Sequence, residues 1–281
     1  MFASPRRAVL ATLLFLPILP RPARATWSVV VLDRARRWIG VAAASCTPDV
    51  YGVMHLRPGQ GVLIAQAVGD ERAIRRANEM LAAGAPPDSV LRAVTASTLD
   101  TASQYRQYAA ATFAGAPSRG LAQFTGDATA PYHGQRRAGD GTVDVLVQGN
   151  SLPDPAVLDR AVGAIQAARA AGRPLQEVLM AGLAAGSAAG GDVRCGPQRA
   201  TSAFLVVARP GEKPFLPYLT LSVFGAERGG VNAVDVLAAR LARWTASGGA
   251  RNVITQEGVQ PPGRAAPDTA RGPRAGADPP R

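Results

Sequence analysis

The sequence predicts an α+β fold in which helices cover two packed antiparallel sheets. Hydrophobic residues make up 47% of the 281-residue chain, which is enough for a large core. Pairs of strand-like runs come both before and after pairs of segments with helical periodicity. That order favours antiparallel sheets with helices layered on them. One such domain is expected over residues 26–246, between an N-terminal signal and a C-terminal tail.

The first half of this domain is expected to hold two hairpins, with one strand and two helices between them. Each expected strand is a short apolar run, whereas each expected helix repeats its apolar residues every three or four positions. The elements are strands at 26–33, 38–45 and 61–67, helices at 70–83 and from 86, and strands at 105–113 and 120–125. Four residues at 34–37 join the first two strands into a hairpin.

The second half of the domain alternates strands and helices in the same way. The expected elements are a strand at 143–147, helices at 154–171 and 174–185, strands at 201–208 and 218–224, and a helix at 233–244. Asp154 before Pro155 has the form of a helix N-cap followed by proline in the first turn. From Ser247 onward, glycine, proline, alanine and arginine dominate without apolar periodicity, so residues 247–281 are expected to be a disordered tail.

Residues 1–25 have the pattern of a removable export signal. Two arginines precede an apolar run at 8–19, and Ala23 and Ala25 form an A-x-A cleavage site. Twelve residues are too few to span a bilayer, which needs roughly 20. We therefore expect a periplasmic or secreted protein with no stable membrane anchor. The paired arginines leave both the ordinary secretory route and the twin-arginine route open.

Cleavage after Ala25 makes Thr26 the first residue of the mature chain. Its hydroxyl and its own α-amine then lie within one residue, and the amine, with a reference pKa of about 7.7–8.0, is partly unprotonated near neutral pH. This pairs a nucleophile with a base. Because side chains alternate along a strand, Ser28 shares the face of Thr26 and is a second polar candidate there. The alternative is that Thr26 merely begins an edge strand.

Two side-chain amides follow the apolar strand at 143–147. Gln148 and Asn150 flank Gly149 just before a helix cap. An asparagine amide or a backbone N–H at a strand end can donate to the oxyanion that develops on an attacked carbonyl. Alternatively, the three residues form a tight turn in which Gly149 has positive φ and Asn150 bonds its own backbone.

Two glycine-containing loops carry the remaining candidates for substrate binding. His133 lies in one loop, and Asp192 and Arg194 lie in the other. Such loops can line a cleft, and an arginine can hold an anionic group through two hydrogen bonds. Each loop can equally be a plain surface connection.

Cys46 and Cys195 are the only cysteines, and in an exported protein a lone pair predicts one disulfide. A zinc site with His55 and His133 is the alternative, but no C-x-x-C or H-x-x-x-H spacing supports it, so no metal is expected. Cys46 as a nucleophile would need a free thiol and a histidine partner that the sequence does not place.

The net charge of +11 falls to +7 once the four arginines of the signal are removed. The remaining basic residues are scattered and form no stripe interleaved with aromatic residues, so no nucleic-acid partner is expected. A basic surface-binding module therefore rests on net charge alone. No residue pattern decides between a monomer and a homo-oligomer, so a homo-oligomer stays open.

Several of these motifs occur in a recognisable order. They are Thr26–Val30, Gly40–Ser45, Phe124–Gly126, Gln148–Asn150, Gly190–Asp192 and Thr201–Ala203. As a set, they make residues 26–244 similar to the uncharacterised family called domain of unknown function 1028, which is grouped with the N-terminal-nucleophile (Ntn) hydrolases. The resemblance implies a four-layer αββα sandwich with Thr26 in the nucleophile's place at the head of the first strand. Proteasome-like relatives carry a lysine on the second strand, where this chain offers only Ser45.

The function expected from the residues and the resemblance together is hydrolysis of an amide bond in a small molecule or peptide. Thr26 attacks, its amine is the base, and Asn150 with a backbone N–H holds the oxyanion; no cofactor is expected. The main alternative is a non-catalytic periplasmic binding or accessory protein on the same fold, which the missing lysine favours, because a fold does not fix a function.

Overall fold

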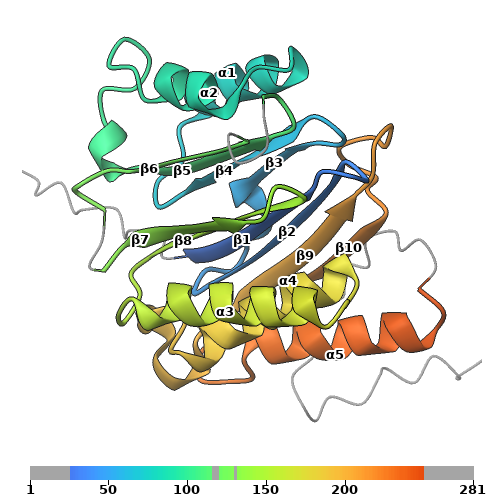
Figure 1. The fold of residues 1–281 in the computed structure, drawn as a ribbon. Helices are drawn as coiled ribbons and strands as arrows, with labels where there is room; N and C mark the ends of the chain where they lie inside the picture. The colour runs from blue at the N-terminus through green and yellow to red at the C-terminus, as the bar shows by residue number, and fades with distance from the viewer. Residues whose placement is uncertain (1–25, 116–119, 130–131, 250–281) are drawn as a thin grey trace, which may run out of the picture.

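The computed structural model describes residues 26–115, 120–129 and 132–249, which form four layers (Figure 1). The strands are β1 (Thr26–Asp33), β2 (Trp38–Ser45), β3 (Met54–Arg57), β4 (Gly61–Gln66), β5 (Gln107–Thr112), β6 (Leu121–Thr125), β7 (Gly134–Gly139), β8 (Val143–Asn150), β9 (Ser202–Ala208) and β10 (Leu219–Val223). The helices are α1 (Glu71–Ala82), α2 (Pro87–Val94), α3 (Ala156–Ala170), α4 (Leu175–Ala188) and α5 (Ala233–Ala246).

All strands belong to two antiparallel sheets, which confirms the predicted α+β class. One sheet has the strand order β10-β9-β2-β1-β8-β7, and the other has the order β3-β4-β5-β6. Helices α1 and α2 cover the outer face of the four-stranded sheet, and α3, α4 and α5 cover the outer face of the six-stranded sheet (Figure 1). Each layer boundary therefore holds a core of its own.

The alternation of side chains along each strand divides β1 between two cores. Val29 and Val31 face the helices of the six-stranded side, whereas Val30 and Leu32 face the space between the two sheets. Both sets are buried, which explains why β1 is a nearly continuous apolar run.

Trp27 fixes which face of β1 turns toward the helices. Its fully buried indole lies in the core under α3 and α4, and Nε1 donates to the carbonyl of Leu183 at 3.4 Å. Gly186 of α4 allows this approach, because a Cβ there would lie 2.9 Å from Nε1. With Trp27 held on the helix side, Thr26 and Ser28 point into the space between the sheets.

Three features differ from the expectations. The sequence does not predict β3 or β7. It also ends the strand that begins at Val143 three residues too early, since β8 continues to Asn150. The alternative of a tight turn at Gln148–Asn150 is wrong, because these residues pair with β1 in regular register and Gly149 does not have positive φ. The predicted signal at 1–25 lies outside the described residues, as does most of the predicted tail.

The predicted disulfide between Cys46 and Cys195 is present, with an S–S distance of 2.05 Å. Cys46 follows the last residue of β2, and Cys195 lies in a short 3-10 helix, Val193–Gln198. The bond joins positions 149 residues apart in sequence. In the described part of the chain, no helix is long and apolar enough to cross a bilayer.

We expect loss of this disulfide to destabilise the domain strongly. Replacing both cysteines, Cys46→Ser with Cys195→Ser, should lower the free energy of unfolding by about 5 kcal/mol in the chain-entropy account of a loop this long. Urea unfolding of the oxidised wild type and the double variant measures the difference, and the reduced wild type should behave like the double variant. Two free thiols in protein isolated without reductant would contradict the pairing.

Candidate active site between the sheets

Four polar residues lie side by side across the six-stranded sheet. Thr26 of β1 is paired with Ser45 of β2 on one side and with Asn150 of β8 on the other, and Ser45 is paired with Ser202 of β9. All four are buried, with Thr26 only 1% exposed. We call Ser202, Ser45, Thr26 and Asn150 the polar row.

The polar row lies at one end of a face that is otherwise apolar. Its side chains share the strand face of Val30, Val41 and Leu146, which form the core between the two sheets. One pair further along β1, the buried residues Ser28 and Gln148 face each other across the β1–β8 ladder. The space between the sheets is thus apolar at one end and polar at the Thr26 end.

Hydroxyl groups connect Thr26 to the end of β2. The Thr26 Oγ1 atom donates to Ser45 Oγ at 3.3 Å, and Thr47 Oγ1 donates to the same oxygen at 3.1 Å. Thr47 Oγ1 also reaches the backbone carbonyl of Asp49 at 3.1 Å. Ser45 lies on the second strand, where proteasome-like relatives carry a lysine. It therefore contacts the candidate nucleophile directly.

Two glutamines from the four-stranded sheet complete the surroundings of Thr26. Gln66, at the end of β4, donates from Nε2 to the carbonyl of Thr26 at 3.1 Å and to Gln107 Oε1 at 2.6 Å. Its Oε1 accepts from Ser28 Oγ at 2.8 Å. Gln107, at the start of β5, donates to the carbonyl of Gly149 at 3.0 Å. These bonds tie the two sheets together at the first residue of β1.

Asn150 is held by the same glutamine pair. Its Nδ2 donates to Gln107 Oε1 at 3.1 Å, whereas its buried Oδ1 has no hydrogen-bond partner among the described residues. Both amide atoms of Gln148 and the Ser202 hydroxyl oxygen are also buried and unpartnered in the described part of the chain. A buried polar group without a partner costs about 1–3 kcal/mol. Several such groups beside one threonine are typical of a site that binds water or a ligand.

Asp192 and Arg194 contact each other and the end of β2. The fully buried Asp192 accepts from the Cys46 backbone N–H at 2.7 Å and from Arg194 Nη2 at 2.8 Å. It also caps the 3-10 helix by accepting from the Arg194 N–H at 3.0 Å. The pair thus holds the disulfide-linked segment against the residue after Ser45. Substrate binding by these two side chains stays a prediction.

His133 lies beyond the Asn150 end of the polar row. It precedes Gly134, the first residue of β7, which is paired with Gly149 of β8. The His133 ring Nδ1 lies 3.3 Å from the carbonyl of Thr129. The residue is therefore close to Asn150 along the sheet, and a contact with substrate stays a prediction.

A cavity of about 750 Å³ opens beside Thr26. Its polar lining includes Thr26, Thr47 and Gln66, and its apolar lining includes Val53, Val68 and Ile74. We call it the Thr26 cavity. A small molecule or a short peptide segment fits a volume of this size.

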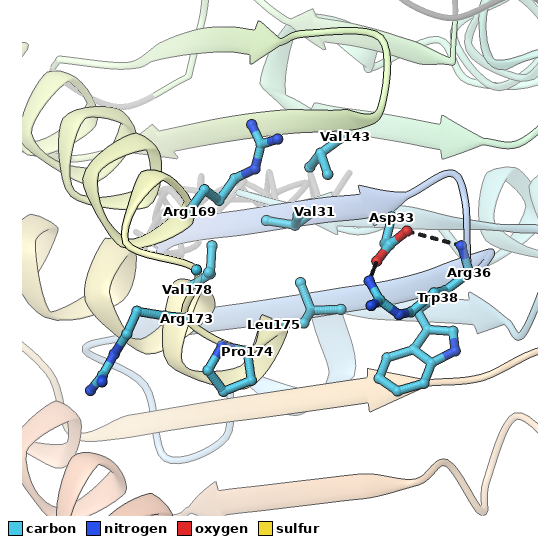
Figure 2. Close-up of a pocket in the computed structure, with 11 residues that line it drawn as sticks. Val31, Asp33, Arg36, Trp38, Val143, Arg169, Arg173, Pro174, Leu175 and Val178 are labelled. Carbon is cyan, nitrogen blue, oxygen red and sulfur yellow. Dashed lines mark hydrogen bonds and ion pairs between the residues drawn. The ribbon is translucent and has the colours of Figure 1, made fainter.

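A second cavity, of about 530 Å³, lies at the other end of β1. Figure 2 shows Arg36 bonded to Asp33 at its edge, with Trp38 and Leu175 among the apolar lining. Asp33 and Thr26 are the two ends of an eight-residue strand, roughly 23 Å apart at the usual strand rise. We call this the Arg169 cavity; it contributes nothing to the surroundings of Thr26.

The described residues contain no group of three or more His, Cys, Asp and Glu side chains placed to hold a metal ion. Burial lowers the pKa of His55 below its ordinary value, and its ring lies in β3 of the other sheet. The alternative zinc site is wrong in its ligands, because both cysteines are in the disulfide.

Sequence reasoning did not find Gln66 or Gln107. Each is a polar residue at the end of an apolar strand, and each lies on the strand face that elsewhere builds the inter-sheet core. The same signal, a polar residue at the end of an apolar face, was used for Thr26 and Ser28. It identifies all four positions once it is applied to every strand.

Comparison with known proteins supports a family but no activity. The sequence model of a family of unknown function, DUF1028, matches residues 26–228. The crystal structure of protein SPO2555 from Silicibacter pomeroyi, itself described as DUF1028, is 25% identical with a TM-score of 0.63, and the match covers 79% of this chain and 86% of that one. Among curated proteins, none matches the sequence. Since the family model spans most of the domain that carries the polar row, the chain belongs to the DUF1028 family of unknown function.

Proposed function

We propose that this protein is an exported Ntn hydrolase that cleaves an amide bond after removal of its signal exposes Thr26. The observation that carries the proposal is the place of Thr26. It begins one of the two central strands of the six-stranded sheet, points between the two sheets and borders a cavity large enough for a substrate. The four-layer arrangement agrees with the fold of that superfamily.

The surroundings of Thr26 favour its own amine as the base. The other members of the polar row and the two glutamines carry hydroxyls and amides, none of which takes up a proton near neutral pH. The freed α-amine has a reference pKa of about 7.7–8.0 and is attached to the same residue as the hydroxyl. In the full chain this nitrogen is a peptide N–H, so the uncleaved precursor would be inactive.

The proposed reaction has two steps. The Thr26 oxygen attacks the amide carbonyl while its proton passes to the α-amine, and the proton then goes to the nitrogen that leaves as the C–N bond breaks. Water hydrolyses the resulting ester, which restores the hydroxyl and releases the acid. Asn150 is the proposed oxyanion donor: one Nδ2 hydrogen is used by Gln107, and the second is available for the developing charge.

The alternative of a non-catalytic binding or accessory protein keeps one observation in its favour. The Arg169 cavity is apolar at its centre and lies far from Thr26, so it could bind a ligand without any chemistry. Its basic side chains are already neutralised, since Arg36, Arg169 and Arg173 pair with Asp33, Asp140 and Glu177. This alternative predicts that Thr26 can be replaced without loss of function.

The first test uses acylation of Thr26, which needs no knowledge of the substrate. A β-lactone is a strained ester that an activated hydroxyl opens, so mature protein starting at Thr26 should gain one adduct by intact mass. One extra residue before Thr26 keeps the hydroxyl but removes the base, and we expect acylation about 10²–10⁴-fold slower. Thr26→Ala should gain none, whereas Thr26→Ser should still react, more slowly because its rotamers are less restricted. Equal acylation with the extra residue would contradict the mechanism.

The second test separates catalysis from structure at Asn150. Asn150→Ala should slow acylation by about 10²–10³-fold, as expected for loss of an oxyanion donor. Its Tm should change little, because Gln107 keeps its bond to Gln66. Thr112→Ala is the matched control, because it removes a buried polar group at the other end of β5 from Gln107, and it should acylate at the wild-type rate. A lower Tm with an unchanged acylation rate would make Asn150 a scaffold residue.

A further inference from the structure

The Thr26 cavity has an acidic lining on a basic protein. Among the described residues, the only ionisable side chains that line it are Asp49 and Glu71, both carboxylates, although the full chain carries a net charge of +11. Cleavage adds the α-amine of Thr26, which serves as the base of the proposed reaction. Opposite charge in a cleft attracts and orients a ligand, and like charge repels it. The lining therefore distinguishes ligands by the sign of their charge.

Of the two carboxylates, Asp49 has no cationic partner among the described residues. It is exposed, and its Oδ1 accepts from the backbone N–H of Tyr51 at 2.7 Å. No ion pair to Asp49 occurs among the described residues, whereas Glu71 lies 3.7 Å from Arg75 in a pair that is exposed on both sides. An exposed pair of this kind is weak, so Glu71 keeps much of its attraction for a second cation.

Two arginines that adjoin lining residues, Arg72 and Arg106, contact other groups. Arg106 pairs with Asp100 at 2.9 Å, and its Nη1 donates to the carbonyl of Val68 at 2.9 Å. Arg72 lies 3.9 Å from Asp70, the N-cap of α1. Neither arginine lines the cavity.

Asp49 is connected to the nucleophile through a short segment. It lies four residues after Ser45 of the polar row, and Thr47 Oγ1 contacts both Ser45 Oγ and the Asp49 carbonyl. Asp49 and Thr26 therefore line the same cavity and are joined by this short segment. Val68 and Ile74 contribute apolar lining to this cavity.

We propose that the ligand of this cavity is a cationic amide. Its ammonium or guanidinium group lies at Asp49 and Glu71, its apolar part packs against Val68 and Ile74, and its amide carbonyl lies at Thr26. As a statement about a substrate, this rests on the hydrolase function proposed above. The two carboxylates disfavour anionic amides.

The test compares two small amides that differ in charge alone. Nα-acetyl-L-argininamide carries a guanidinium group as its only charge, and Nα-acetyl-L-citrullinamide carries a neutral urea group of the same shape. Isothermal titration gives both Kd values for mature protein carrying Thr26→Ala, which cannot turn either compound over. We expect the arginine compound to bind about three- to tenfold more tightly, as for a cation beside two exposed carboxylates. At about 1 M salt, where the screening length is about 3 Å, this ratio should fall toward one.

Substitutions of the carboxylates test whether Asp49 and Glu71 cause the preference for the cationic amide. Asp49→Asn with Glu71→Gln should bring the ratio of the two Kd values to about one. Asp88→Asn is the matched control, because it removes one exposed carboxylate from α2, outside the cavity, and should leave the ratio unchanged. Equal affinity for the two amides, no binding of either, or a ratio that survives the double substitution would overturn the proposal.

The outcome is distinguishable from that of the hydrolase proposal. Acylation of Thr26 that depends on the free amine, without a preference for the arginine compound, would refute the charge selection and leave the hydrolase standing. A preference that follows Asp49 and Glu71, without acylation of Thr26, would assign the cavity to cation binding in a non-catalytic protein.

Discussion

The fold depends on β1 being paired along its whole length on both edges. All eight residues, Thr26 to Asp33, have partners in β2 and in β8, so the backbone donors and acceptors of the strand are committed on both sides. A one-residue shift in either ladder would turn Trp27 out of the helix core and Thr26 away from the other sheet. The position of Thr26 is therefore set by the burial of the whole strand, and it needs no special local conformation.

The Thr26 end of the space between the sheets is polar, whereas the rest of this space is filled by apolar side chains. At the apolar end, packing alone holds the sheets together, whereas at the Thr26 end the sheets are joined by side-chain hydrogen bonds through Gln66 and Gln107. Such a network is favourable only when its members are satisfied. Asn150 and Gln148 leave atoms without partners in the described structure. Their cost is offset by the well-packed strands around them.

The sequence predicts a feature when the pattern that identifies it lies within a single strand or helix. Strands such as β1 and β8 were found because both of their faces are buried, which gives long apolar runs. The edge strand β7 was missed because its residues alternate between exposed and half-buried and include two arginines. Thr26 and Asn150 were selected from local pattern, but the roles of Gln66 and Gln107 depend on contacts between different sheets. The ion pair between Asp192 and Arg194 was not predicted, because the sequence placed both residues in a loop as candidates for substrate binding.

The disulfide also determines what a protease can do to this domain. The span from Cys46 to Cys195 contains the four-stranded sheet, β7, β8 and helices α1 to α4. A single cut in any loop of that span leaves two polypeptides that remain covalently joined. Three members of the polar row, Thr26, Ser45 and Ser202, lie outside the span, and Asn150 is held to them by the β1–β8 ladder. A nicked molecule thus keeps its mass, apart from the added water, and its row of polar residues until it meets a reductant.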